Sequence, residues 1–171
     1  MYASLARRLY ESNDVHEALR IIKELKKKLR DRIPSLEEVK ALFPEIIFTD
    51  NITKQRGLVR YILARFDGQL SSAVPVDYEA MTIEHLASQS LIGTSGFTED
   101  IVGQVGNLIL VSGDLNQKLR NKMFSEKKQI LQAANFPLPR DIAAASDWSP
   151  QNIISRTESM AVESYNELWK I

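Results

Sequence analysis

The sequence predicts a mainly helical α+β fold in which a small β-hairpin and its following helix lie between helical layers. Hydrophobic residues recur every three or four positions over residues 14–33 and again from residue 149 onward, which is typical of helices with one buried face. The middle of the chain instead holds two short runs rich in β-branched and apolar residues, 81–86 and 106–112, which favour strands.

Length and composition limit the classes of protein. The chain has 171 residues, 44% of them hydrophobic, which suits a single domain with a sizeable core. It has no cysteine, so disulfides and thiolate metal sites are excluded. The apolar runs are too short to span a bilayer, and the N-terminus lacks the features of a signal peptide, so we expect no membrane contact and a cytoplasmic location.

Residues 1–70 are expected to form a helical layer. An amphipathic helix comes first, and a second covers residues 14–33, with Asn13 or Asp14 as its cap and Pro34 at its end. The lysine-rich part of that helix includes an i,i+4 pair, Glu24 and Lys28, so we interpret its charges as a solvated face rather than a DNA contact.

Two more helices are expected in this layer. Ser35 and Glu38 form a capping box that opens a short helix ending near Phe43, and another helix covers about residues 52–66. Asp67-Gly68 and the stretch 71–75 then predict a break in the chain.

We expect residues 71–135 to form the core of the domain and residues 136–171 to close it, within one domain of 1–171. The core would run strand, loop, strand and helix, with the second helix of this part beginning near Phe124. Pro150 suits the first turn of the closing helix.

Charge is distributed unevenly along the chain. The net charge is zero, but residues 71–112 carry five acids and no lysine or arginine, whereas residues 1–70 carry 14 bases and 10 acids and residues 113–140 carry six bases and two acids. An acidic segment between two basic ones could hold a cation beside a polyanion, although chance segregation on a solvated surface also explains this pattern.

Four polar residues of the core have the chemistry for phosphodiester hydrolysis. Glu84 and His85 lie on the first strand, Asn107 opens the second, and Asn116 falls early in the following helix. Histidine suits the base that activates water because its pKa is about 6.5. A hard cation such as Mg²⁺ binds oxygen ligands, which Glu84 and Asn116 offer, and the amide of Asn107 could orient the imidazole.

The adjacency of Glu84 and His85 sets a structural condition. Neighbouring residues of a regular strand point to opposite faces, so the two share a site only if the strand ends, twists or bulges there. If the strand stays regular, Glu84 is not the ligand, and another acid such as Asp114 or Asp77 must be considered. The other histidine, His16, lies on a charged helix surface and is assigned no role.

Several motifs in order resemble a known family. The segments TIEHLASQS (82–90) and VGNLILVSGDLNQKLRNKMFSEKKQIL (105–131) resemble the C-terminal nuclease domain of GmrSD-type modification-dependent restriction endonucleases, which is similar to HNH, or ββα-metal, nucleases. The matching positions are Ile83-Glu84-His85-Leu86, Gly106-Asn107-Leu108, Asn116, Phe124 with Lys127-Lys128, and the later Trp148 and Arg156.

This resemblance implies a DNA endonuclease domain of a restriction or anti-phage defence protein. It implies His85 as general base, Asn107 as the residue that orients it, and Glu84 and Asn116 as ligands of Mg²⁺ or Mn²⁺. The substrate would be double-stranded DNA, with or without modified bases. Lys118, Lys127 and Lys128 would meet phosphates, although a solvated helix face explains them equally well.

The resemblance also implies a longer protein. In this family an N-terminal nucleotide-binding sensor domain restrains cleavage, and no Walker-type phosphate loop occurs in the present chain. We therefore expect the chain to be a fragment that works with such a sensor.

One departure from the family pattern keeps other functions open. The family has a proline three residues after the histidine, where this chain has Ser88. Proline would fix the exit of the strand but performs no chemistry. The alternatives are a catalytically degenerate domain that only binds DNA or a protein partner, and a purely structural helical domain, which would leave the polar residues of the hairpin unexplained.

Overall fold

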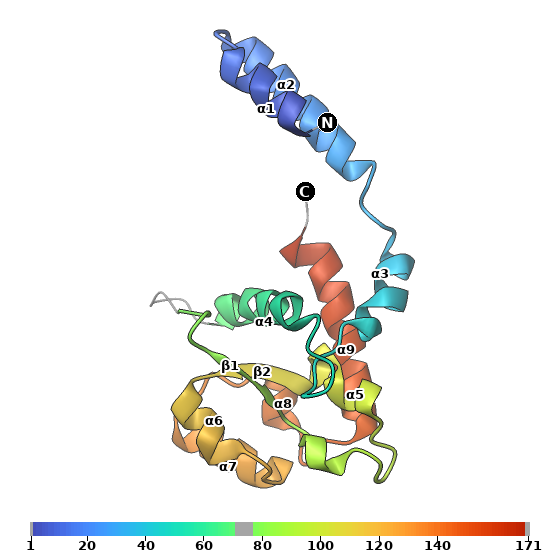
Figure 1. Ribbon diagram of the computed structural model, residues 1–171, viewed down its shortest axis with the longest axis vertical. Coiled ribbons are helices and arrows are strands. Elements are labelled where there is room, and N and C mark those ends of the chain that lie inside the picture. The colour runs from blue at the N-terminus through green and yellow to red at the C-terminus, as the bar shows by residue number, and fades with distance from the viewer. Residues whose placement is uncertain (1, 71–76, 170–171) are drawn as a thin grey trace.

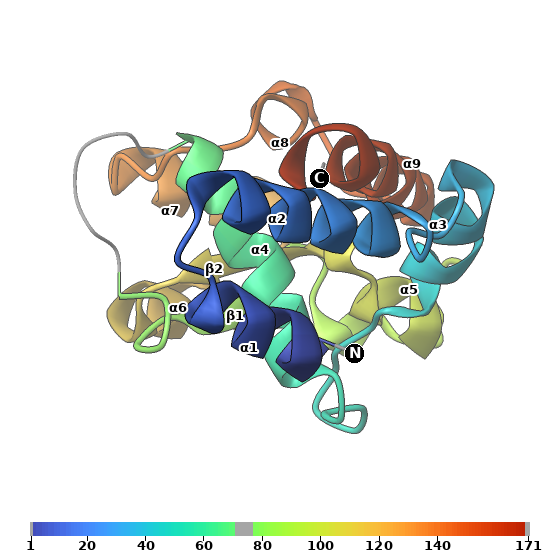
Figure 2. The same ribbon diagram turned by 90° about the horizontal axis from the view of Figure 1, so that it is seen from above.

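The computed structural model describes residues 2–70 and 77–169, which form a projecting helical arm and a larger body (Figure 1). We call residues 2–33 the arm and residues 34–169 the body. In the arm, α1 (Tyr2–Glu11) and α2 (Val15–Arg30) lie side by side in both views (Figure 2). Leu5 and Ile21 are buried between them. Both helices are present as predicted, although α2 ends at Arg30, before Pro34, and the two form an arm apart from α3 and α4.

Local sequence signals determine where the first helices begin. The carboxylate of Asp14 accepts hydrogen bonds from the backbone N–H groups of His16 and Glu17, and so caps α2. The predicted capping box of Ser35 and Glu38 is present at the start of α3 (Leu36–Leu42), which a 3₁₀ turn, η1 (Phe43–Glu45), follows.

Helix α4 (Arg56–Leu70) begins and ends later than expected. It continues through Asp67 and Gly68, so the break predicted there is wrong. One glycine in a helix costs only about 1 kcal/mol, which the burial of Val59, Ile62 and Leu63 on the core face of α4 outweighs. The rest of the predicted break, residues 71–75, lies outside the described residues.

A two-stranded antiparallel sheet lies at the centre of the body. Strand β1 (Thr82–His85) pairs with β2 (Leu108–Val111) in a continuous register, from Thr82 opposite Val111 to His85 opposite Leu108. The connection between them contains the 3₁₀ turn η2 (Gln89–Leu91), helix α5 (Glu99–Gly103) and a second 3₁₀ turn, η3 (Val105–Asn107). Helix α5 was not expected, since its segment was predicted as a loop.

Each face of the sheet packs on its own hydrophobic cluster, as the two-residue period of a strand dictates. Leu108 and Leu110 of β2 face a cluster with α4 and α9, whereas Ile109 and Val111 face a cluster with α6 and α7. Figure 1 shows α4 on one side of the strands and α6 and α7 on the other. The hairpin is therefore buried on both faces.

Of the remaining helices, α6, α7 and α9 follow the predicted order, whereas the short α8 was not predicted. These helices are α6 (Gly113–Leu119), capped by Ser112, α7 (Phe124–Ala133), the short α8 (Arg140–Ala144) and α9 (Pro150–Glu163), which starts with Pro150 after the cap Ser149 and ends in a π turn, η4 (Ser164–Leu168). The mainly helical α+β class is thus confirmed. Within the described ranges, no helix has the length and apolar character needed to cross a membrane.

Candidate active site

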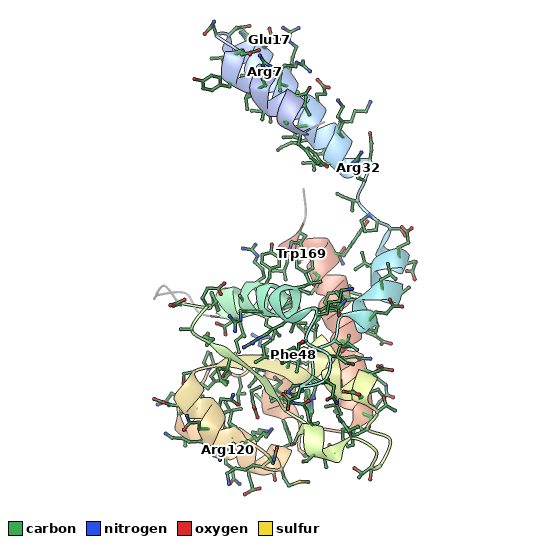
Figure 3. The ribbon with its side chains drawn as sticks, in the orientation of Figure 1. Arg7, Glu17, Arg32, Phe48, Arg120 and Trp169 are labelled. Carbon is green, nitrogen blue, oxygen red and sulfur yellow. The ribbon has the colours of Figure 1, made fainter. Side chains whose placement is uncertain are left out.

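His85 ends β1 on the face of the sheet that carries α4. Its ring is 6% exposed and stacks on the ring of Phe48, with 6.0 Å between centroids and 22° between planes. The imidazole Nε2 lies 2.9 Å from the backbone oxygen of Phe48, which belongs to the loop between η1 and α4. Figure 3 labels Phe48, which is half-buried, within the outline of the body.

This contact determines which ring nitrogen is basic. A carbonyl oxygen only accepts hydrogen bonds, so Nε2 carries the hydrogen and the neutral ring keeps its lone pair on Nδ1. Burial lowers the pKa of His85 below its ordinary value of 6.5, and the bond to Phe48 opposes this only in part. At neutral pH the ring is therefore an uncharged base with an oriented Nδ1.

Asn107 is completely buried, and its amide joins three segments. Its Oδ1 accepts from the backbone N–H of Ala87 at 2.8 Å and from the indole of Trp148 at 3.1 Å. Its Nδ2 donates to the carbonyls of Ala87 and Val102, at 3.0 and 2.8 Å. The amide thus holds the chain just beyond His85, and the hydrogen bond that orients the imidazole comes from Phe48.

Glu84 takes part in a buried ion pair. Its Oε1 lies 2.7 Å from the ammonium of Lys127 on α7, and that ammonium also donates to the backbone oxygen of His85. Glu84 is 7% exposed and Lys127 only 1%. Desolvation raises the pKa of Glu84 and lowers that of Lys127, while their attraction opposes both changes.

The strand keeps its alternation at Glu84 and His85. Both residues pair in register with β2, opposite Ile109 and Leu108, so their side chains leave opposite faces of the sheet. Glu84 accordingly meets Lys127 of α7, whereas His85 meets Phe48 on the other face. No bulge brings the two side chains together.

The other candidate cation ligands lie near the surface. Asn116 is half-buried on α6, and its side chain makes no hydrogen bond with any described residue. Asp114 is exposed in the first turn of α6, and Asp77 is exposed with one carboxylate oxygen bound to the backbone N–H of Glu79. Among the residues that the structure describes, no three acidic or histidine side chains form a cluster that could hold a metal ion.

The three lysines expected to meet phosphates differ in position. Lys118 is exposed on α6 and has no ion pair in the described part of the chain. Lys128 is half-buried and donates to the backbone oxygen of Ala145 at 2.8 Å. For Lys127 the expectation is wrong: it is an internal cation that neutralises Glu84, because a carboxylate buried beside it would otherwise be left unpaired.

Comparison with known families accounts for most of the body. Residues 37–163 match the family model of the C-terminal domain of GmrSD restriction endonucleases. The chain belongs to this family. Neither the curated proteins nor the solved structures to which the chain was compared gave a match.

Membership of the GmrSD C-terminal domain family relates the chain to restriction-type nucleases, whose substrate is DNA. The match covers the hairpin, α6, α7 and α9, and so includes all seven predicted site residues. It begins at residue 37, so the arm lies outside the matched region.

Ser88, where the resemblance led us to expect proline, has a backbone conformation that proline could also adopt. Its φ is −60° and its ψ is 144°, within the narrow range of a proline ring. The hydroxyl donates to Oδ1 of Asn121 at 3.1 Å and accepts from the hydroxyl of Ser90 at 2.9 Å. Side-chain hydrogen bonds therefore hold the exit of β1 in this member of the family.

Two contacts of the candidate site in this GmrSD family member were not predicted from the sequence. The acceptor on Phe48 is a backbone oxygen 37 positions before His85, which no side-chain pattern reveals. The burial of Lys127 had one signal, since the pattern Phe124, Lys127, Leu131 follows the buried face of α7. A lysine at such a position predicts an internal counter-ion, because buried ammonium groups are almost always paired.

Proposed function

We propose that this chain is the metal-dependent DNA endonuclease domain of a restriction or anti-phage defence protein, with an HNH-like, ββα-metal arrangement of β1, β2 and α6. The observation that carries the proposal is the orientation of His85. Its Nε2 is bound to Phe48, and its Nδ1 has no hydrogen-bond partner among the described residues. The same residue occupies the histidine position of the family motif.

The chain's own residues would act as follows. Nδ1 of His85 accepts the proton of the attacking water, and the depressed pKa of His85 keeps it unprotonated at neutral pH. Asn107 holds the backbone directly after His85, because its side-chain amide bonds to both the N–H and the carbonyl of Ala87. The ring of Phe48 excludes water from one side of the imidazole. His85 would thus meet its substrate already oriented.

We further propose that Asn116 holds Mg²⁺ or Mn²⁺ together with Glu84 or, because β1 stays regular and Glu84 and His85 leave opposite faces, with Asp114 or Asp77. Carboxylate and amide oxygens are the donors that these ions prefer, and Mg²⁺ commonly takes few protein ligands and keeps several waters, so the donor chemistry fits. Oε1 of Glu84 already binds Lys127, so the cation would use the other carboxylate oxygen or compete with that ammonium. When bound, it would stabilise negative charge on the phosphodiester.

Cleavage of supercoiled plasmid tests the base. With Mg²⁺ or Mn²⁺ present, His85→Ala and His85→Asn should both lower the nicking rate by at least about a hundredfold, the usual contribution of a general base. His85→Asn keeps a polar group near Phe48 and should stay folded, as a melting curve would show. Equal nicking by the wild type and both variants would exclude this role for His85.

Calorimetry with Mn²⁺ tests the ligands without relying on activity. Asn116→Ala should weaken Mn²⁺ binding, and it is the cleaner variant because it leaves the Glu84–Lys127 pair intact. Glu84→Gln should also weaken it. If Asp114→Asn or Asp77→Asn abolishes binding instead, the cation belongs to those acids, as the regular strand would then require.

The second candidate function is a catalytically degenerate domain that binds DNA or a protein partner. The ion pair favours it, because Lys127 already supplies the positive charge that Glu84 would take from a metal. Absence of Mn²⁺ binding in every variant and in the wild type would support this alternative. In either case we propose a cytoplasmic protein whose N-terminal nucleotide-binding sensor domain acts on the same DNA, with or without modified bases.

A further inference from the structure

We propose that the arm is a DNA-binding element that grips the phosphate backbone without reading sequence. The proposed surface consists of Arg20, Lys23, Lys27 and Arg30 on α2, which we call the cationic stripe. For these four residues the proposal replaces the interpretation of the charges as a solvated face, which rested on the Glu24–Lys28 pair. The inference extends the proposed nuclease function, since it concerns how that domain would hold its DNA. It begins from the observation that residues 34–171 carry more acids than bases.

The body alone should repel DNA. Residues 34–171 hold 13 lysines and arginines against 17 acids, whereas residues 1–33 hold nine against five. Of the three core lysines expected at phosphates, Lys127 is buried and Lys128 is bound to a carbonyl, which leaves Lys118. DNA affinity depends mainly on neutralised phosphates, so a second source of cations is required, and the arm has the right sign.

The stripe is one continuous face of α2. Its members are spaced by three, four and three residues, so they lie above one another along the helix, and all four are exposed. The buried Ile21 points toward α1, away from this face. From Arg20 to Arg30 the stripe extends about 15 Å, a length over which B-DNA carries about nine negative charges.

Most of these charges have no ion-pair partner in the part of the chain that the structure describes. Lys23, Lys27 and Arg30 form no ion pair with any residue in the described ranges, and Arg20 has only a 3.7 Å contact with Glu17. Lys28 and Arg8 both bind Glu24, at 2.6 and 3.0 Å, and so neutralise this acid, which lies four residues after Arg20 and three before Lys27. The stripe therefore has charge that is available to an outside anion, as does the exposed Lys26 beside it.

The position of the arm suits a long ligand. It projects from the body, with Glu17 at its far end and Arg32 near its base (Figure 3). A second copy of the chain is a poorer occupant. Leu19 and Ile22 are partly exposed beside the stripe, and docking two arms through them would bring two cationic stripes close together.

Fluorescence anisotropy with a labelled DNA duplex tests the proposal on the whole chain. EDTA in the buffer prevents metal-dependent cleavage, so binding is measured alone. The double variant Lys23→Ala with Lys27→Ala should raise Kd about tenfold or more. It should also reduce the slope of log affinity against log salt by about 2, roughly one for each phosphate that the protein no longer neutralises.

The matched control removes the same charge from the same arm. Arg8→Ala with Lys28→Ala deletes two cations that already pair with Glu24, and should change Kd by less than about twofold. Far-UV circular dichroism checks that both double variants keep their helices. Equal weakening by both would mean that net charge, and not the stripe, binds DNA, and no weakening by either would also overturn the proposal.

Two further outcomes separate this inference from others. A wild-type dimer in sedimentation that dissociates in the stripe variant, with unchanged DNA binding, would identify a second copy as the occupant and defeat the proposal. If DNA binds through the stripe but is not cleaved, only the proposed nuclease function is contradicted. If cleavage depends on His85 and is unchanged in the stripe variant, only the proposed role of the stripe is contradicted.

Discussion

At the scale of single residues, the candidate base is oriented by the main chain. A backbone carbonyl cannot be lost by substitution at its own position, so the acceptor on Phe48 tolerates many side chains. The stacked ring is the replaceable part of this contact. Burial keeps the imidazole neutral, and this has a consequence for stability.

The stability of the protein should depend on the protonation of His85. The unfolded histidine binds its proton near pH 6.5, whereas the folded one binds it only at lower pH because its pKa is lowered. As the pH falls below about 6.5, the unfolded state binds more protons and the free energy of unfolding decreases. Urea unfolding at several pH values measures this change.

His85→Asn serves as the control for this pH dependence, since it has no titrating ring. The loss of stability between neutral pH and pH 5 should be smaller in this variant than in the wild type. An identical loss in both proteins would show that other groups cause the pH dependence. The same lowered pKa predicts an acidic limb of the cleavage rate below pH 6.5.

Ser88→Pro should be accommodated. The backbone already has proline geometry, and Ser88 is not among the residues whose N–H donates a backbone bond in this turn. Proline lowers the conformational entropy of the unfolded chain, which stabilises the folded protein by about 0.4–1 kcal/mol. This gain offsets the hydrogen bonds to Asn121 and Ser90 that the substitution removes. The free energy of unfolding should change by less than about 1 kcal/mol in denaturant titrations, and a larger loss would show that the hydroxyl network is essential.

At the scale of elements, the start of β2 is held by α9. The backbone N–H of Gly106 donates to the hydroxyl of Thr157, and the guanidinium of Arg156 donates to the carbonyls of Gly106 and Leu108, at 2.7 and 3.2 Å. Arg156 is in turn paired with Asp141 at 2.9 Å. Turn η3 and helix α9 therefore approach closely, backbone to backbone.

Gly106→Ala should disrupt this contact. An added Cβ would overlap with the hydroxyl of Thr157 and the carbonyl of Ile153, which are fixed parts of α9. Overpacking of this kind costs about 1–3 kcal/mol, measurable as a lower midpoint in thermal unfolding. Gly57→Ala is the control, because no atom lies within 4 Å of its added Cβ, and it should not destabilise the protein. Equal effects at both glycines would disprove close packing at η3.

The sequence predicts elements well where the signal is local. Asp14 and Ser35 each cap a helix through bonds within three residues, so local spacing identified Ser35 and narrowed the cap of α2 to Asn13 or Asp14. The continuation of α4 through Gly68 was missed because the tertiary burial of its apolar face overrides a weak local propensity.

The sequence predicts which residues belong to the candidate site, but not which residues they contact. Glu84, His85 and Asn116 lie on the predicted strand and helix, whereas Asn107, expected to open the second strand, lies in η3 directly before β2. Their partners come from distant segments, as the bond between Asn107 and Trp148 illustrates, and such pairings arise from packing rather than from spacing. The ion pair of Lys127 with Glu84 was not predicted, because it too joins distant segments through packing.

At the scale of the whole molecule, arm and body are separate packing units. Helices α1 and α2 contact mainly each other, whereas α3 and the elements after it gather around α9 and the hairpin. The arm has a very small core, with Leu5 and Ile21 as its buried apolar residues among those described. Its folding should therefore be independent of the body.

Ile21→Asp tests this independence. A buried aspartate without a partner should separate α1 from α2 and reduce the helical signal in far-UV circular dichroism. The near-UV signal of the buried Phe124–Trp148 stack, and its melting temperature, should stay as in the wild type. The neighbouring Ile22 is 37% exposed, and Ile22→Asp should change neither signal. A lower melting temperature of the body in Ile21→Asp alone would show that the two parts fold together.

The buried lysine has a consequence for synthesis of the chain. Glu84 and His85 leave the ribosome 43 and 42 residues before Lys127, and Asn107 precedes Trp148 by 41. Gly106 precedes its partner Arg156 by 50. The hairpin therefore cannot complete its contacts until the last third of the chain has been made, so an unfinished copy of this domain would lack the contacts that hold His85 and Glu84 in place.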